Sequence, residues 1–132
     1  MVPPVAGPPT ADADCARLQA ALPTRLDPDL TRRPTTPSSP RTAAWGGQPV
    51  VLRCGTPRPE DLRPTSNLAE VNGVSWFQQI GGQAVTWTAV DRTGYVDLTV
   101  PTSYADQSGF LIDVGAAVAR ALPRLPVDTS RP

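Results

Sequence analysis

The chain has 132 residues, the size of one domain, and its 12 basic residues, all arginine, balance 12 acidic residues. The zero net charge argues against a strongly basic nucleic-acid-binding protein, and no apolar run reaches the ~18 residues of a membrane span. Histidine is absent and cysteine occurs twice, so zinc, haem, Ser-His and Cys-His chemistry lack their usual residues, and we expect neither a metal nor a cofactor.

Proline-rich ends flank a body of ordinary domain size. We expect residues 1–12 to be a disordered proline-rich spacer, 13–122 to be a single domain and 123–132 to be a disordered tail. The N-terminus lacks the basic and apolar regions of a signal peptide. Two interpretations of that absence stay open: a cytoplasmic protein, or the mature form of an exported one.

The first predicted elements are a helix and an extended segment. Residues 14–22 predict a helix with Cys15, Leu18 and Leu22 on one face, and Pro23 ends it. Three prolines spaced by three within residues 31–41 favour an extended, polyproline-like path.

Strand patterns follow. Residues 42–45 and 50–54 predict two strands around a Gly-Gly-Gln-Pro turn, with Cys54 on the apolar face of the second strand. Asn72-Gly73 is a two-residue hairpin signal. Residues 75–79 predict a strand, with a helix as the alternative, and Gly81-Gly82 ends that element.

The clearest element is a hairpin formed by residues 84–90 and 95–100. Symmetric closure of its four-residue loop brings together positions whose numbers sum to 185. One face is then apolar and the other is largely polar, as expected where one side of an antiparallel sheet faces solvent. The apolar pairs are Val85–Val100, Trp87–Leu98 and Ala89–Val96, and the polar face pairs Thr86–Thr99, Thr88–Asp97 and Val90–Tyr95.

The C-terminal part predicts a last strand over residues 110–113 and then a helix. Gly115 is expected to be the N-cap of that helix, and Val114, Val118 and Leu122 form its apolar stripe. The resulting fold class is α+β: a mostly antiparallel sheet with short N-terminal and C-terminal helices packed on one face.

The two cysteines, Cys15 and Cys54, are both at positions predicted to face the core. Leu, Ile, Val and Phe make up only about a fifth of the chain, near the limit for burying enough apolar surface to fold. A disulfide closing so long a loop would add about 4 kcal/mol of stability, a large share of the total for such a domain. We therefore predict one Cys15–Cys54 disulfide and hence an oxidising, extracytoplasmic location. Two buried free thiols in a cytosolic protein are the alternative.

Seven blocks of the body resemble one known family. They are residues 15–18, 21–23, 42–46, 49–55, 71–77, 85–92 and 95–101, of which Arg-Cys-Gly at 53–55 and Val-Asn-Gly-Val at 71–74 are the most specific. Together they resemble the actinobacterial family called domain of unknown function 3515. The resemblance implies an uncharacterised protein with a hydrophobic export or anchor segment ahead of a proline-rich and alanine-rich spacer. It implies no catalytic residues.

Binding residues are sought among the tryptophans and arginines. Trp45 and Trp76 are candidates for an exposed aromatic binding face, although core packing is the favoured interpretation for both. Arg58 and Arg63, in a proline-rich and arginine-rich loop, are candidates for contact with anionic envelope polymers, against ordinary solvated charge. The prolines 34, 37 and 40 form a PxxP-like tract, which we interpret as a structural crossover.

The function favoured by these observations is a non-enzymatic binding or scaffolding domain of the cell envelope. Its expected partner is an envelope protein or a cell-wall glycan. We do not expect it to bind nucleic acid. The carboxylates Asp91 and Asp97 are expected in a turn and on a solvated face, with ordinary pKa values and no poised acid or base. The alternatives are a small carboxylate-based envelope hydrolase and a cytoplasmic interaction protein with reduced thiols.

Overall fold

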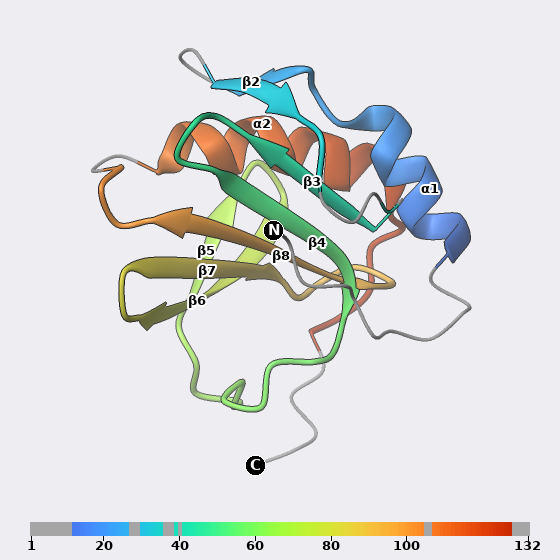
Figure 1. Ribbon diagram of the computed structural model, residues 1–132. Helices are drawn as coiled ribbons and strands as arrows, with labels where there is room; N and C mark the ends of the chain where they lie inside the picture. The colour runs from blue at the N-terminus through green and yellow to red at the C-terminus, as the bar shows by residue number, and fades with distance from the viewer. Residues whose placement is uncertain (1–11, 27–29, 36–38, 40, 105–106, 128–132) are drawn as a thin grey trace.

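In the part of the chain that the structure describes, eight strands form one sheet and two helices pack on it (Figure 1). The computed structural model describes residues 12–26, 30–35, 39, 41–104 and 107–127. The elements in chain order are α1 (Asp12–Ala21), β1 (Arg25–Leu26), β2 (Leu30–Arg33), β3 (Thr42–Trp45), β4 (Val50–Thr56), β5 (Leu68–Val71), β6 (Val74–Gly81), β7 (Ala84–Ala89), β8 (Tyr95–Pro101) and α2 (Ser108–Ala121).

The strands form one antiparallel sheet in the order β1-β2-β3-β4-β8-β7-β6-β5. After β4 the chain crosses to the far edge of the sheet as β5 and returns strand by strand until β8 pairs with β4. Both helices pack on one face, with α2 behind the strands in the view of Figure 1. The α+β class predicted from the sequence is confirmed.

The predicted hairpins are confirmed. Residues 84–89 pair with 96–101 in the expected register, so that Trp87 lies opposite Leu98 and Thr88 opposite Asp97. The pair Val90–Tyr95 does not form, because the Val90 amide instead donates to the Ser75 carbonyl at 3.0 Å. Asn72 and Gly73 both have positive φ, 49° and 85°, as the two-residue turn between β5 and β6 requires.

The N-terminal elements match the prediction in part. The helix and the strands β3 and β4 lie where the pattern placed them, and residues 75–79 are strand. Residues 31–33 are extended, as predicted, but they belong to the strand β2, which pairs with β3, and are not a polyproline-like segment. Prolines 37 and 40 of the PxxP-like tract lie outside the described residues.

The strand predicted at 110–113 is wrong, because these residues belong to α2. The helical stripe begins at Phe110 and Leu111, which are buried, whereas Ile112 is 45% exposed. An alternating strand would not bury adjacent positions in this way. Gly115 is consequently inside the helix and not at its N-cap, which is Gln107.

The main core lies between the sheet and the helices. Val50, Leu52 and Cys54 of β4 face it, as predicted. Trp87 packs at its margin, half-buried, and its indole Nε1 donates to Gln107 Oε1 at 2.8 Å.

The other face of the sheet is covered in part, whereas the prediction was that it faces solvent. Leu62, from the loop between β4 and β5, packs with Phe77 and Val90 into a second small core. Thr88, predicted to face solvent, is only 1% exposed. The reason is that the loop folds back onto the sheet, which local alternation does not reveal.

Residues 123–127 also pack on the fold, so the predicted domain boundary at residue 122 falls too early. Arg124 forms an isolated bridge with Arg92, and the Leu125 amide donates to the Asp91 carbonyl at 2.9 Å. Val127 packs against the second core. The remaining parts of the predicted spacer and tail, 1–11 and 128–132, lie outside the described residues.

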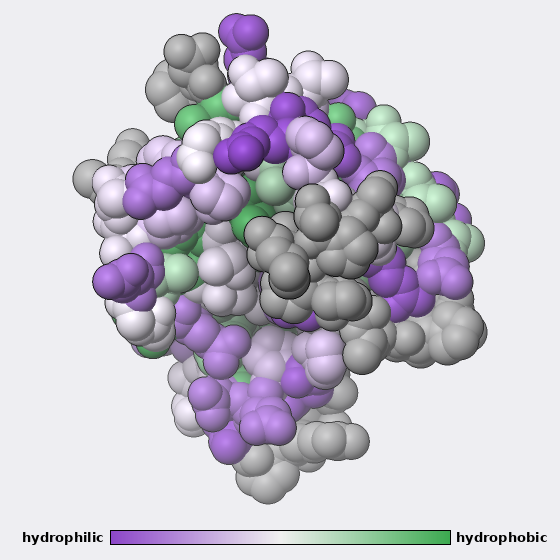
Figure 2. All heavy atoms as spheres, in the orientation of Figure 1, coloured by the Kyte–Doolittle hydropathy of each residue, from purple (hydrophilic) through white to green (hydrophobic). Residues whose placement is uncertain are grey.

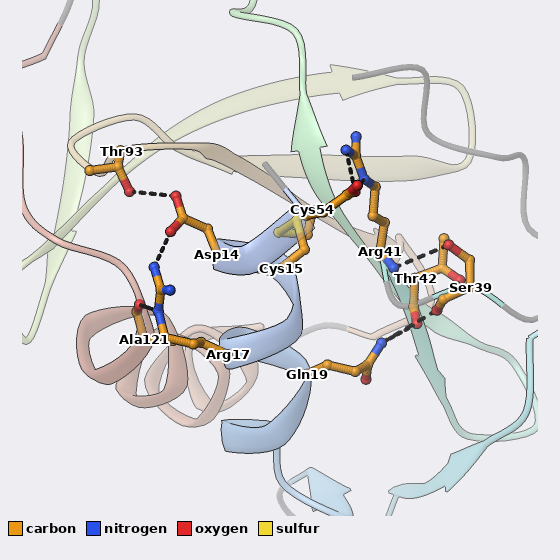
Figure 3. The surroundings of a disulfide bond; sticks show 11 residues. Asp14, Cys15, Arg17, Gln19, Ser39, Arg41, Thr42, Cys54, Thr93 and Ala121 are labelled. Atoms are coloured by element: carbon orange, nitrogen blue, oxygen red, sulfur yellow. Dashed lines mark hydrogen bonds and ion pairs between the residues drawn. A yellow bond between two sulfur atoms is a disulfide. The ribbon is translucent and has the colours of Figure 1, made fainter. Parts of the chain in front are cut away.

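The predicted disulfide is present. Cys15 of α1 is bonded to Cys54 of β4, with their Cα atoms 5.8 Å apart, and both residues are buried (Figure 3). It fastens one side of α1 to the sheet.

Three side chains of α1 hold it further. Asp14 accepts a hydrogen bond from the Thr93 hydroxyl at 3.1 Å, Arg17 donates to the Ala121 carbonyl at 3.3 Å, and Gln19 donates to the Thr42 carbonyl at 2.9 Å (Figure 3).

Candidate functional site

Two arginines stand next to a surface pocket at the end of β2. Arg32 and Arg33 are the last residues of that strand, and they lie opposite Trp45 and Ala44 of β3. Beyond them no β2–β3 pairing is formed, and the next residue, Pro34, has no amide hydrogen to donate to a ladder. Where the β2–β3 pairing ends there is a pocket of about 540 Å³, here called the arginine pocket. It is lined by Gln19, Arg32, Arg33, Pro34, Thr35, Ser39, Thr42 and Ala43.

Arg32 is held in place from two sides. Its guanidinium carbon lies 5.5 Å from the centroid of the Trp45 ring, and its Nη2 donates to Gln19 Oε1. Burial lowers the pKa of Arg32, because part of its hydration shell is replaced by protein. It stays charged at neutral pH, because the ordinary pKa of an arginine lies far above neutral pH.

Arg33 is fixed by the turn between β3 and β4. Its Nη1 donates to the Gly46 carbonyl at 2.9 Å and to the Gly47 carbonyl at 3.2 Å. Neither this guanidinium nor that of Arg32 has a carboxylate partner among the described residues. Two positive charges without an acidic partner favour an anionic ligand.

Hydroxyl groups complete the lining. The hydroxyls of Thr35 and Thr42 lie 3.0 Å apart, and Thr42 Oγ1 also donates to the Ser39 carbonyl at 3.4 Å. In Figure 2 strongly hydrophilic side chains gather at the top of the molecule, over β2 and β3. The pocket therefore offers guanidinium, amide and hydroxyl groups, a set suited to a phosphate or carboxylate group.

Trp45 and Trp76 do not form the exposed aromatic face that was one of the two interpretations of these residues. Both are 0% exposed and belong to the main core. Trp45 Nε1 donates to the Pro23 carbonyl at 3.0 Å, and Trp76 lies against Gly115 of α2. Their large apolar area is used in packing, so no ligand reaches either ring.

Arg58 and Arg63 lie in the loop between β4 and β5, and neither lines the arginine pocket. Arg58 Nη2 donates to the Leu62 carbonyl at 2.9 Å, so this side chain stabilises its own loop. Arg63 is exposed and its guanidinium contacts the Glu60 carbonyl. A role of either residue in binding stays a prediction.

The carboxylates differ most from expectation. Asp91 is 3% exposed, and Asp97 accepts a 2.6 Å hydrogen bond from the buried Thr88 hydroxyl. Burial raises the pKa of Asp97, and the hydrogen bond from Thr88, the nearby Thr56 hydroxyl and the charge of Arg53 oppose that shift only in part. The predicted ordinary pKa of Asp97 is therefore wrong, because the face that carries it is covered.

The arginine pocket was missed by sequence reasoning, although one signal was present. Two adjacent arginines before a proline are visible at positions 32–34. What the pattern did not show is that these residues are a strand, next to Gln19 of α1.

Neither helix in the described part of the chain is long and apolar enough to cross a membrane. Within residues 12–26, 30–35, 39, 41–104 and 107–127, no three His, Cys, Asp or Glu side chains gather in a group that would hold a metal ion. Comparison of the chain with curated proteins and with solved structures finds no match. A family model does match residues 1–127, and the chain thus belongs to the family described as Protein of unknown function (DUF3515).

Proposed function

We propose that the protein is a non-enzymatic binding domain of the cell envelope that captures an anionic group of an envelope polymer or protein in the arginine pocket. The observation that carries the proposal is the pair Arg32 and Arg33, two fixed guanidinium groups at one opening with no carboxylate partner among the described residues. Prepositioned guanidinium groups bind anions with little loss of side-chain freedom.

Binding rather than catalysis is supported by the residue types in this pocket. Its described lining consists of Gln, Arg, Pro, Thr, Ser and Ala side chains. None of these groups exchanges a proton near neutral pH, as a general acid or base does. An extracytoplasmic location is supported by the Cys15–Cys54 disulfide, because such bonds persist in oxidising compartments.

Binding is tested by titrating the labelled full chain with glycerol 3-phosphate and with galacturonic acid and recording amide chemical shifts. We expect saturable shifts at Gln19, Thr35 and Thr42, and we expect added salt to weaken them. Arg33→Gln should raise the Kd about 10-fold, since a charged hydrogen bond contributes ~1.5–3 kcal/mol. The matched control is Arg120→Gln, because Arg120 is exposed on α2 and lies outside the pocket.

Two results would contradict the proposal. One is the absence of saturable binding by both anions, and the other is an equal Kd for Arg33→Gln and Arg120→Gln. The location is tested separately by fractionating cells that produce the native gene product. Recovery of reduced protein from the cytosol alone would contradict an envelope location.

A carboxylate-based hydrolase is the second candidate, and one observation favours it. Burial raises the pKa of Asp97, and a carboxyl group with a raised pKa is a feature of general acids. Turnover of a cell-wall fragment by the purified protein, abolished in Asp97→Asn and kept in Asp61→Asn, would favour this function over binding.

A further inference from the structure

The disulfide lies one helical turn from a residue of the arginine pocket. Cys15 and Gln19 are both on α1, and the four positions between them make about one turn of an α-helix. Cys15 is bonded to Cys54 of β4, whereas Gln19 lines the arginine pocket. Figure 3 shows that both side chains extend from α1 toward strands of the sheet. The bond and the pocket therefore depend on the position of the same helix.

Gln19 is a positioning residue for Arg32. Its Oε1 accepts a hydrogen bond from Arg32 Nη2, and its Nε2 donates to the Thr42 carbonyl at 2.9 Å. The other contact described for this guanidinium is the Trp45 ring, whose centroid lies 5.5 Å from the guanidinium carbon. The face of an aromatic ring attracts a cation but does not fix the direction of its N–H groups. Gln19 therefore orients the donors of Arg32 in the pocket.

Few apolar contacts hold α1 to the fold. Of its ten residues only Cys15 and Leu18 are buried, and Leu22 is the next buried residue after the helix. An isolated helix shorter than ~12–15 residues is marginal in water. The position of α1 therefore depends on its attachment to the rest of the protein.

Two polar contacts of α1 lie at the surface. Asp12, with a side chain 68% exposed, pairs with Arg41, and the hydrogen bond from Thr93 to Asp14 is exposed. Exposed polar pairs contribute little to stability, because water competes for both partners. The disulfide is the attachment of α1 that does not open by thermal fluctuation, since breaking it requires thiol–disulfide exchange.

We propose that formation of the Cys15–Cys54 disulfide completes the arginine pocket, so that the oxidised chain captures its anion and the reduced chain binds it weakly. The inference rests on the proposed function, anion capture, and names the regulation of that site. With both thiols reduced, α1 opens from the sheet and Gln19 leaves Arg32, whose donors are then no longer held in one direction.

The oxidant is a disulfide-bonded thiol compound or protein of an oxidising compartment. A bond forms between the sulfurs of Cys15 and Cys54, and the disulfide bond of the oxidant breaks. The two cysteine thiols lose two electrons and two protons, and the oxidant receives them and leaves as two thiols. Anion binding then begins only after the chain has reached such a compartment.

The experiment titrates glycerol 3-phosphate into the labelled full chain, oxidised and after reduction with excess dithiothreitol, with folding followed by circular dichroism. We expect the Kd of the folded reduced chain to be about 10-fold higher, as for the loss of one charged hydrogen bond. The matched control is the double variant Cys15→Ala/Cys54→Ala, which should have the higher Kd with and without reductant.

Gln19→Ala keeps the disulfide and tests the connection to Arg32. It should raise the Kd about 10-fold in the oxidised chain, and reduction should then add little, because the same contact is already lost. Gln83→Ala, at an exposed glutamine outside the arginine pocket, should leave both the Kd and its response to reduction unchanged. If reduction unfolds the whole chain, Gln19→Ala decides, and an unchanged Kd in that variant overturns the proposal.

Hydrogen exchange gives a measurement that needs no ligand. On reduction the amides of Leu18 and Gln19 should lose protection, whereas the amides of the β7–β8 pairing should keep it. Equal protection of α1 in the oxidised and reduced chains would overturn the proposal, as would an equal Kd in the two folded forms, and either result would leave anion capture intact. Absence of binding by the oxidised chain would overturn the proposed function together with this inference.

Discussion

The hydroxyl of Thr88 donates a 2.6 Å hydrogen bond to Oδ1 of Asp97 on the sheet face turned away from the helices. The two residues are direct partners in the β7–β8 pairing, and Thr88 is 1% exposed. The bond stabilises the charged form of a carboxylate that burial destabilises, and the net result is a raised pKa for Asp97. The stability of the folded protein therefore depends on the protonation of Asp97, and so on pH.

Removal of the Thr88 hydroxyl should destabilise the protein. Thr88→Val keeps the shape of the side chain but takes away a donor from a buried carboxylate, which costs about 1–3 kcal/mol of unfolding free energy. The control is Thr86→Val, because Thr86 is half-buried and its hydroxyl lies 3.2 Å from that of Thr99. That change should stay within about 0.5 kcal/mol. Urea unfolding measures both, and equal losses would argue against a buried hydrogen bond at Thr88.

Asp97→Asn should change how stability depends on pH. Because the pKa of Asp97 in the folded protein lies above its ordinary value of 3.8, the folded state binds more protons than the unfolded state between these two values. The contribution of Asp97 is therefore fully present below pH 3.8 and is lost as the pH rises through the folded-state pKa.

The measurement is the unfolding free energy of both proteins from pH 3 to pH 7. Asp97→Asn should gain stability relative to the native chain as the pH rises, and the difference should become constant at neutral pH. A difference that changes in the opposite direction would mean that hydrogen bonds and Arg53 outweigh burial in setting this pKa.

Loss of the disulfide should have a large effect on stability. Replacing Cys15 and Cys54 together by alanine should lower the unfolding free energy by about 4 kcal/mol, because the unfolded chain is no longer constrained by a loop of 39 residues. Reductant should have a similar effect on the native chain and none on the double variant. Alkylation of two free thiols in the folded native chain, made in an oxidising compartment, would contradict the bond.

Gly115→Ala should stabilise the protein. A Cβ atom at this position would lie 3.7 Å from Trp76 Cζ2, an ordinary van der Waals distance, and alanine favours a helix interior by ~1 kcal/mol over glycine. The matched control is Ala116→Gly, at an exposed site of the same helix, which should lose a similar amount. Destabilisation by Gly115→Ala would show that Trp76 needs a closer approach of α2.

Trp45→Ala should destabilise the fold, because the Trp45 side chain packs in the main core and is not part of a binding surface. Trp45 is 0% exposed, and truncation of a buried aromatic side chain costs about 3–5 kcal/mol. The control is Trp87→Ala, since Trp87 also donates an indole hydrogen bond but is only half-buried. We expect a smaller loss there, and equal losses in urea unfolding would contradict the difference in burial.

Several elements were predictable because their signals are local. The β7–β8 register follows from alternation on both sides of one short loop, and a slip by one residue would have placed Trp87 on the wrong face. Asn72-Gly73 determines its own turn through positive φ. The Cys15–Cys54 bond was predictable because a helix stripe and a strand face each placed one cysteine toward the same core.

The start of α2 was not predictable from a short window. Residues 110–113 satisfy a strand pattern when taken alone. A helix forms because it buries Phe110, Leu111 and Val114 together against the face of the sheet. Gly115 was predicted to be a helix boundary for the same reason, whereas in the structure it lies inside the helix, next to Trp76.

By itself the sequence determined the fold class, the hairpins and the disulfide, since these depend on periodicity, turn chemistry and a small set of core-facing positions. The arginine pocket and the burial of Asp91 were decided by tertiary structure alone. The arginine pocket exists because α1, β2 and the β3–β4 turn meet around Arg32 and Arg33. Asp91 is buried because residues 123–127 return across a loop more than 30 positions earlier in the chain. Contacts between segments so far apart leave no periodic trace in either segment, because each segment alone satisfies its own local preferences.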